Sequence, residues 1–306
     1  HIWMWGSDGK RNSSSGDGPR AILGEPGNQI DRRNLRYFAA RIGPLPGWTM
    51  GYGFDTENGV ATVEQLDNWK SYLDSKMSWD HFLGSRVGYD EKGLWALVPR
   101  GPRPEHDENY RSEIKDENCF WLNGDYMGYT GYRPLYRRYR EAIQHHPEKP
   151  SFEEDRFRLR NSSQWNYKDY NEELTRRGLW HSALAGGVAN IWGNLLPEPD
   201  HGGSNPYAIK DQIKTYSLFF KNRFLKSYKS RENDGQLFLV SPKTNHAVIY
   251  AENTAEINFH EVAKYIDEPV VAVDAKKKYS ELKINSDISD KIWRAPYKSD
   301  WAIAIG

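Results

Sequence analysis

The stretch Trp48–Glu57, WTMGYGFDTE, joins a short apolar run to two carboxylates. The run Trp48–Phe54 is rich in aromatic residues and glycine and has the length of a buried strand. Asp55 and Glu57 follow the last apolar residue directly. We therefore predict a strand whose carboxyl end carries acidic side chains.

The sequence on either side of this strand has helical spacing. In Asp31–Ile42 the apolar residues recur every three or four positions, and Asp31 is the predicted N-cap. Val63–Lys76 is amphipathic in the same way. Strands and helices alternate over the first two thirds of the chain. The further predicted strands are His1–Trp5, Asp80–Arg86, Gly124–Tyr132, Lys149–Phe152 and Gly186–Trp192, and the further predicted helices are Arg133–His145, Asn171–Leu184 and Pro206–Leu225.

This alternation predicts βαβ units and a parallel sheet. A doubly wound dinucleotide fold is disfavoured because no G-x-G-x-x-G follows the first strand. Polar clusters follow several different strands, which is typical of a (β/α)8 TIM-type barrel. We expect this α/β barrel to occupy residues 1–229 and to be incomplete at its N-terminus.

From about Gln236 the pattern changes to short apolar runs separated by turns. The runs are Gln236–Ser241, Ala247–Ala251, Glu256–Phe259, Pro269–Asp274 and Trp301–Ile305. They predict a small antiparallel β-sandwich domain over residues 230–306, preceded by the polar link Lys229–Asp234.

Composition restricts the function classes. The 42 basic and 42 acidic residues cancel, so no nucleic-acid partner is expected, and no apolar run is long enough to span a membrane. With Cys119 as the only cysteine and no His-x-x-x-His motif, no metal and no cofactor are expected. Twelve Trp and nineteen Tyr suit a sugar-binding cleft, because pyranose rings pack on aromatic faces.

Hydrolysis of a glycosidic bond requires two carboxyl groups on either side of the scissile bond. Asp55 and Glu57 follow one predicted strand, and Glu153 and Glu154 follow another. In a barrel the two clusters would face each other across the mouth. The alternative is that these acids are helix caps or solvated loop charges. Further candidates at strand ends, as sugar-binding residues or as packing residues, are Trp5, Asp8, Arg86, Tyr126, Tyr129, Trp192 and Asn194.

Four stretches resemble the apiosidase-like glycoside hydrolases of the cellulase-like clan. They are ARIGPLPGWTMGYGFDTEN (Ala40–Asn58), DHFLGSR (Asp80–Arg86), KPSFEEDRFR (Lys149–Arg158) and RRGLWHSALAGGVANIWGN (Arg176–Asn194). The ending APYKSDWAIAI (Ala295–Ile305) is similar to the collagen-binding-type β-domain that often follows such barrels.

The resemblance implies a TIM barrel, a retaining mechanism and two site residues. It assigns the acid/base role to Glu57, with Asp55 as the alternative, and the nucleophile role to Glu154, with Glu153 as the alternative. The chain departs from the clan at Thr56, where an Asn usually precedes the acid/base Glu. In that clan the acid/base residue follows the fourth strand of the barrel and the nucleophile follows the seventh.

We therefore expect a secreted or periplasmic glycosidase acting on a polysaccharide or oligosaccharide. A non-catalytic carbohydrate-binding or scaffold protein on a degenerate barrel is the alternative. Arginines near strand ends (Arg86, Arg133, Arg156, Arg158) are compatible with an acidic glycan or with ion pairs. We also expect His1–Trp5 to pair with Trp48–Phe54, with its other edge open or completed by residues outside the 306-residue chain.

Overall fold

The computed structural model describes residues 2–3, 29–51, 63–90, 93–96, 119–123, 136–137, 139–140, 143–144, 151–154, 172–187, 189–191, 209–221, 223, 228–241, 243–265, 268–284 and 290–306. The chain forms two compact units. The first comprises residues 1–128 and 144–154, and the second comprises residues 129–143 and 155–306. The predicted domain boundary between residues 229 and 230 stays a prediction.

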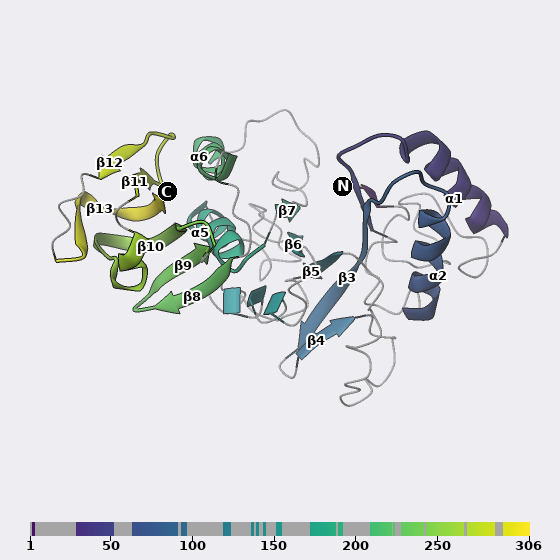
Figure 1. Ribbon diagram of the computed structural model, residues 1–306, viewed down its shortest axis with the longest axis horizontal. Coiled ribbons are helices and arrows are strands. Elements are labelled where there is room, and N and C mark those ends of the chain that lie inside the picture. Colours follow the sequence, from purple (N-terminus) through teal and green to yellow (C-terminus); the bar gives the residue numbers. More distant parts are fainter. Residues whose placement is uncertain are drawn as a thin grey trace, which may run out of the picture. The chain divides into compact units, whose positions relative to one another are not determined.

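The first unit contains a mainly parallel sheet with the strand order β1-β2-β3-β5-β6 (Figure 1). Strand β4 pairs antiparallel with β3, outside this order. The strands are β1 (Ile2–Trp3), β2 (Thr49–Gly51), β3 (Phe82–Asp90), β4 (Gly93–Ala96), β5 (Cys119–Asn123) and β6 (Ser151–Glu154). The predicted pairing of His1–Trp5 with Trp48–Phe54 is confirmed, because Ile2 lies beside Met50 in parallel register.

Two helices connect the first three strands, as the spacing predicts. Helix α1 (Gln29–Ile42) lies between β1 and β2, and α2 (Val63–Asp74) lies between β2 and β3. Leu35 and Ala39 of α1 are buried one helical turn apart, which is the periodicity of a core-facing helix. Asp31 is buried in the first turn of α1 and is not the N-cap, because the helix begins two residues earlier. A negative charge there still suits the positive end of the helix dipole.

Other elements differ from the prediction in their bounds. Strand β3 begins and ends later than Asp80–Arg86, and β5 was not predicted. The predicted strand Gly124–Tyr132 lies outside the described residues. The described parts therefore confirm alternating strands and helices in a mixed α/β chain. A closed barrel is not seen in them, and the open edge of β1 stays a prediction.

The second unit contains a six-stranded antiparallel sheet with the order β12-β11-β13-β10-β9-β8. This confirms the antiparallel character of the C-terminal segment, while a second sheet that would complete the predicted sandwich is not seen in the described residues. The strands are β8 (Lys229–Asn233), β9 (Gln236–Ser241), β10 (His246–Asn258), β11 (Val270–Asp274), β12 (Leu282–Ile284) and β13 (Ile292–Ile305), and a 3-10 helix, η5 (His260–Tyr265), follows β10.

The predicted polar link Lys229–Asp234 is wrong, because it forms strand β8. Asp234 and Gly235 connect β8 to β9 as a two-residue turn, with φ angles of 48° and 74°. Positive φ at both positions is the requirement of the type I′ hairpin, and Asp-Gly is a favoured pair for it. Three of the five side chains of β8 are exposed, so its apolar signal is weak.

The predicted runs Ala247–Ala251 and Glu256–Phe259 are parts of one strand, β10, apart from Phe259. The strand bends where its pairing with β13 shifts register. Arg294 lies beside Glu256 and Ser299 lies beside Thr254, so four residues of β13 stand opposite a single residue of β10. Such a bulge interrupts the alternation that predicts a continuous strand.

The core of this sheet is apolar, and two helices pack against the sheet. Ile249 and Ile303 are fully buried beside each other on β10 and β13. The helices are α5 (Glu172–Leu184) and α6 (Lys210–Lys221). Trp180 of α5 stacks on Tyr250 of β10 with ring centroids 5.3 Å apart and an interplanar angle of 5°. Because successive residues of a strand alternate between the faces of a sheet, Tyr250 and Trp180 lie on the face opposite to the core around Ile249.

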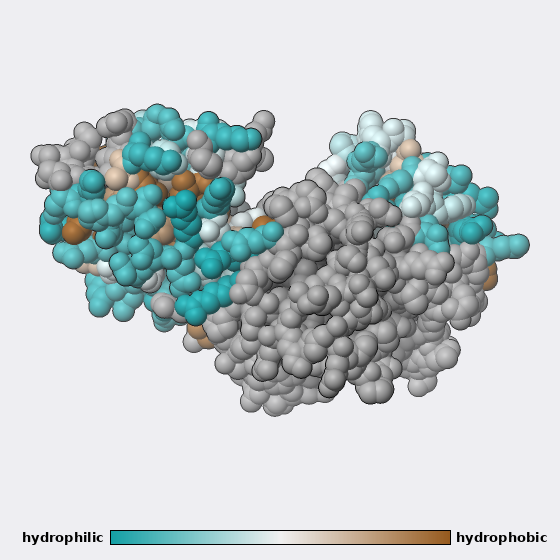
Figure 2. Space-filling model, turned by 60° about the horizontal axis from the view of Figure 1, so that its bottom comes forward, coloured by the Kyte–Doolittle hydropathy of each residue, from teal (hydrophilic) through white to brown (hydrophobic). Residues whose placement is uncertain are grey.

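The described surface is mostly hydrophilic in the view of Figure 2, with apolar side chains in small separate groups. Strand β8 is an edge strand of the antiparallel sheet, and a side chain bonds to its backbone. The hydroxyl of Tyr136 donates to the carbonyl of Arg231 over 3.2 Å. A bonded edge strand is protected from pairing with another chain.

Strand β7 (Ala189–Ile191) also belongs to the second unit. No described helix is both long and apolar enough to cross a membrane.

We expect Ile249→Ala to lower the free energy of unfolding by about 2–5 kcal/mol, because it leaves a cavity in a packed core. Leu282→Ala in β12 is the matched control, since Leu282 is 43% exposed. The control should cost less than about 1 kcal/mol. Urea denaturation followed by circular dichroism measures both, and equal costs would contradict the assignment of the core.

Candidate functional site

Most predicted site residues lie outside the part of the chain that the structure describes. These are Trp5, Asp8, Asp55, Glu57, Tyr126, Tyr129, Trp192 and Asn194. The structure gives backbone positions for the remaining three, Arg86, Glu153 and Glu154. The predicted candidates can therefore be compared only through strand register.

The two glutamates are the last residues of β6 (Ser151–Glu154). The prediction that the strand stops at Phe152 is wrong by two residues. Each glutamate lies in register with a residue of β5: Leu122 beside Glu153, and Asn123 beside Glu154. Both strands therefore end at the same level, with Asn123 and Glu154 as their final pair.

Successive residues of a strand alternate between the two faces of a sheet, and parallel neighbours in register share a face. Position 154 therefore shares the face of Phe152 and of its neighbour Trp121. Trp121 is in register with Arg86 of β3, so Arg86 belongs to this face as well. The sheet thus brings positions 86, 123 and 154 to one face.

Position 153 belongs to the opposite face. Its neighbour Leu122 is in register with Val87, which lies four residues after Leu83 and shares its face. Leu83 is fully buried, as is Met50 beside it on β2. Position 153 therefore shares a face with two buried apolar residues, and position 154 belongs to the other face.

The two acidic clusters follow parallel strands of one sheet. Strand β2 ends at Gly51, four residues before Asp55, and β6 ends at Glu154. The carboxyl ends of parallel strands lie at the same edge of their sheet, and that edge carries the active site in α/β barrels. The topology therefore brings the carboxyl ends of β2 and β6 to the same edge, while the residues of the 55–57 cluster lie outside the described part of the chain.

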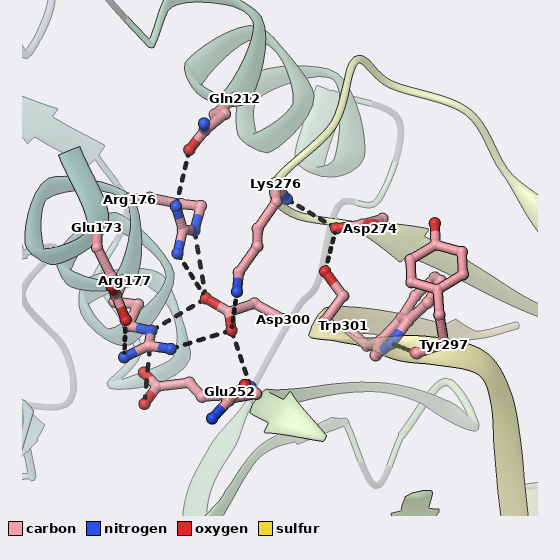
Figure 3. A network of polar contacts seen from close by, with 12 residues as sticks. Glu173, Arg176, Arg177, Gln212, Glu252, Asp274, Lys276, Tyr297, Asp300 and Trp301 are labelled. Atoms are coloured by element: carbon pink, nitrogen blue, oxygen red, sulfur yellow. Dashed lines mark hydrogen bonds and ion pairs between the residues drawn. The ribbon is translucent and has the colours of Figure 1, made fainter. Parts of the chain in front are cut away.

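The second unit contains a buried ionic network centred on Asp300 of β13 (Figure 3). Oδ2 of Asp300 accepts hydrogen bonds from Nη2 of Arg176 at 2.8 Å and from Nε of Arg177 at 3.0 Å. Oδ1 accepts the backbone N–H of Asn253 at 2.8 Å and lies 3.5 Å from Nζ of Lys276. Asn253 has a φ of 48° at the irregular part of β10, which directs its N–H toward the carboxylate.

The network extends to both helices. Nη1 of Arg176 donates to Oε1 of Gln212 on α6 over 2.9 Å. Nε2 of His181 lies 2.7 Å from Oε1 of Glu252. Glu173 forms an ion pair with Arg177 one helical turn away. Three carboxylate side chains thus form ion pairs with three cationic side chains (Figure 3). The carboxylates are those of Glu173, Glu252 and Asp300, and the cations are those of Arg176, Arg177 and Lys276.

Burial by itself would raise the pKa of Asp300, but hydrogen bonds from Arg177, Arg176 and the backbone of Asn253 outweigh it. The pKa falls from 3.8 to about 2. Burial raises the pKa of the neighbouring Tyr250 well above 10, so that phenol stays neutral. A carboxylate held ionised by two guanidinium groups is a poor proton donor, and the network therefore acts as a structural joint.

Sequence analysis did not find this network. Asp300 directly precedes the predicted strand Trp301–Ile305. A signal was nevertheless present on the helix. Arg176 and Arg177 precede the apolar Leu179 and Trp180, and an arginine beside the buried side of a helix requires a carboxylate partner.

A second polar group lies at the amino end of β3. The buried imidazole of His81 has Nε2 at 2.9 Å from the carbonyl oxygen of Gly43, and it stacks on Trp48 with centroids 3.8 Å apart. The indole N–H of Trp48 donates to the carbonyl of Ile42 over 2.8 Å. The Trp48 hydrogen bond satisfies a carbonyl group at the end of α1, and the group holds this helix end beside the start of β3.

Among the residues with described positions, no group of three or more His, Cys, Asp or Glu side chains could hold a metal ion. The carboxylates of the Asp300 network are instead bound by arginine and lysine.

Comparison with known proteins finds likeness in fold only. No known protein family and no curated protein sequence matches the chain. An alpha-amylase from Lactobacillus plantarum aligns with a TM-score of 0.53 and 7% identity over 90% of this chain, which spans 65% of the amylase chain. A beta-glucuronidase 2 from Bacteroides uniformis, covalently bound to cyclophellitol-6-carboxylate aziridine, aligns with a TM-score of 0.39, at 13% identity, over 89% of this chain and 34% of that one. The chain thus has a distant structural resemblance to glycoside hydrolases.

We expect Asp300→Asn to lower the free energy of unfolding by about 3–5 kcal/mol, because the change leaves two arginines without their buried counter-ion. The matched control is Asp290→Asn, which breaks an exposed ion pair with Arg294. It should cost less than about 1 kcal/mol. Urea denaturation at pH 7 measures the difference, and equal costs would show that the buried network contributes little.

The lowered pKa of Asp300 also predicts a pH dependence. A group whose pKa is lower in the folded state adds stability above its unfolded pKa, and this contribution is lost as the pH falls through the folded value. Between pH 4 and pH 2 the wild type should lose about 2 kcal/mol more than Asp300→Asn. Unfolding free energies of both proteins across this range test the prediction, and parallel curves would refute it.

Proposed function

We propose that the protein is a glycoside hydrolase that cleaves glycosidic bonds in a polysaccharide or oligosaccharide. The observation that carries the proposal is the place of Glu154. It is the last residue of the parallel strand β6, and it shares a face of the sheet with positions 86 and 123. Asp55 and Glu57 follow β2 in the sequence, and their proposed place is beside Glu154 at the carboxyl edge of the sheet, where the two clusters would supply the pair of carboxyl groups that glycoside hydrolysis requires.

The proposed mechanism is retaining. Glu154 attacks the anomeric carbon, while Glu57, or Asp55 in its place, protonates the leaving oxygen and later activates water. Such a pair needs carboxyl groups about 5–5.5 Å apart, whereas an inverting pair needs about 6.5–9.5 Å. The proposed roles of Trp5, Asp8, Arg86, Tyr126, Tyr129, Trp192 and Asn194 are to bind and orient the sugar.

The fold likeness to the alpha-amylase supports the class of the proposal and does not extend to its substrate. The narrower assignment, to apiosidase-like enzymes of the cellulase-like clan, rests on the sequence resemblance. A secreted or periplasmic location belongs to the same proposal, because polysaccharides are met outside the cytoplasm.

The test compares Glu154→Gln with Glu153→Gln. Both changes remove one negative charge from the same strand end, but only position 154 lies on the face of Arg86 and Asn123. We expect Glu154→Gln to lower the hydrolysis rate by more than about a thousandfold and Glu153→Gln by less than about tenfold. Released reducing sugars from neutral and anionic polysaccharides provide the measurement, and thermal melts verify that both variants fold.

Two outcomes would contradict the proposal. Full activity of Glu154→Gln would exclude this residue as the nucleophile. Sugar binding by the wild type without hydrolysis of any polysaccharide would favour the alternative, a carbohydrate-binding protein on a degenerate barrel. The departure at Thr56, before Glu57, is the sequence feature that makes this second outcome worth measuring.

A further inference from the structure

A cationic and aromatic surface lies on the second unit, where the turn after β11 meets the bulge of β13. The turn carries three successive lysines, Lys276–Lys278, and all three are exposed. Tyr297 in the bulge is 41% exposed. Nζ of Lys277 lies 4.1 Å from the centre of the Tyr297 ring and donates to its hydroxyl over 2.9 Å. We call Lys277, Lys278 and Tyr297 the lysine–tyrosine surface.

The turn is held rigidly by residues beneath it. Oδ1 of Asp274 accepts the backbone N–H of Lys276 over 2.9 Å and the hydroxyl of Ser299 over 2.7 Å. The hydroxyl of Thr215 on α6 donates to the carbonyl of Lys277 over 2.6 Å. The backbone that presents the lysines is thus fixed from the helix side and from the sheet side, so little ordering is needed when a ligand binds.

Tyr297 is fixed in a similar way. The indole N–H of Trp301 donates to the carbonyl of Tyr297 over 3.2 Å, and the two rings lie 5.2 Å apart (Figure 3). The bulge of four residues opposite one on β10 places the tyrosine there. Bulges recur where a strand must redirect a side chain.

The acidic groups around this surface are already occupied. Asp274 and Asp300 are buried and bonded within the protein. Glu281 is paired with Arg223 at 2.6 Å and bonded to the hydroxyl of Tyr279. The hydrogen bond to Tyr297 raises the pKa of Lys277, which is therefore charged at neutral pH. The exposed charges of the lysine–tyrosine surface itself are thus positive, although the whole chain has a net charge of zero.

We infer that the lysine–tyrosine surface binds an anionic polysaccharide, one that carries a carboxylate on its sugar rings. Ammonium groups attract the carboxylates, and the tyrosine edge and hydroxyl contact the sugar ring between them. The choice of a polysaccharide among polyanions rests on the proposed function, while the choice of an anionic one rests on the lysines. The surface belongs to a different unit from Glu154 and holds the polymer without taking part in hydrolysis.

The experiment measures binding by affinity electrophoresis in native gels that contain polygalacturonate or neutral dextran, at about 50 mM salt. The full chain carrying Glu154→Gln is used throughout, so that hydrolysis does not change the polymer. Polygalacturonate should retard this protein and dextran should not. Lys277→Ala/Lys278→Ala and Tyr297→Ala should each weaken binding at least about fivefold. Raising the salt to about 0.5 M should weaken it as well, because exposed charges are screened.

The control is Lys243→Ala/Lys264→Ala, which removes two exposed lysines elsewhere in the same unit, one of them also placed over a tyrosine ring. It should keep wild-type retardation. Equal losses in both double variants, equal retardation by dextran, or equally tight binding of a single-stranded oligonucleotide would each overturn the inference. Hydrolysis is measured separately on the wild type, so a failure of binding and a failure of the proposed enzymatic activity are read independently.

Discussion

Asp300 is a carboxylate with no exposed surface, and the second unit is organised around keeping it ionised. Removing a carboxylate from water costs several kcal/mol, which only close cations and N–H donors can offset. The protein supplies Arg176 and Arg177 from α5 and a backbone N–H from the irregular part of β10. Because these groups come from different elements, the helix cannot shift along the sheet without exposing an unpaired charge. Apolar contacts such as the stacking of Trp180 on Tyr250 stabilise the packing of α5 on the sheet, and the ionic network fixes the position of the helix along it.

A different constraint orders the first unit. The strands β1, β2, β3, β5 and β6 pair in parallel, so a crossover connection must join each strand to the next. Helices α1 and α2 form the first two crossovers. Parallel pairing brings all carboxyl ends to one edge of the sheet. Once the register is set, the face of the sheet on which each residue lies is set as well. The face of Glu154 therefore follows from its pairing with Asn123 and from the pairing of Trp121 with Arg86. A shift of one residue would exchange the two glutamates.

Sequence periodicity predicted the elements whose burial is regular. Helix α1 buries Leu35 and Ala39, and β9 is buried along its whole length, so both were predicted within two residues. Strand β8 was not predicted because three of its five side chains face solvent, and the bulge in its pairing hid that β10 is one continuous strand. The site was predicted only as acidic strand ends. The choice between Glu153 and Glu154 depends on pairing with a strand, β5, that sequence reasoning did not identify.

The two groups of carboxylates differ in what their surroundings allow. Asp300 has its oxygens bonded to arginines and to a backbone N–H, which lowers its pKa and removes it from proton transfer near neutral pH. General acid catalysis needs the opposite, a carboxyl group whose pKa lies near the working pH. A buried structural ion pair and a catalytic pair of carboxyl groups thus require opposite environments. A likeness in fold at 7% identity shows neither of these environments in this chain. The proposed chemistry is therefore assigned to Glu154, the last residue of a parallel strand, and not to Asp300.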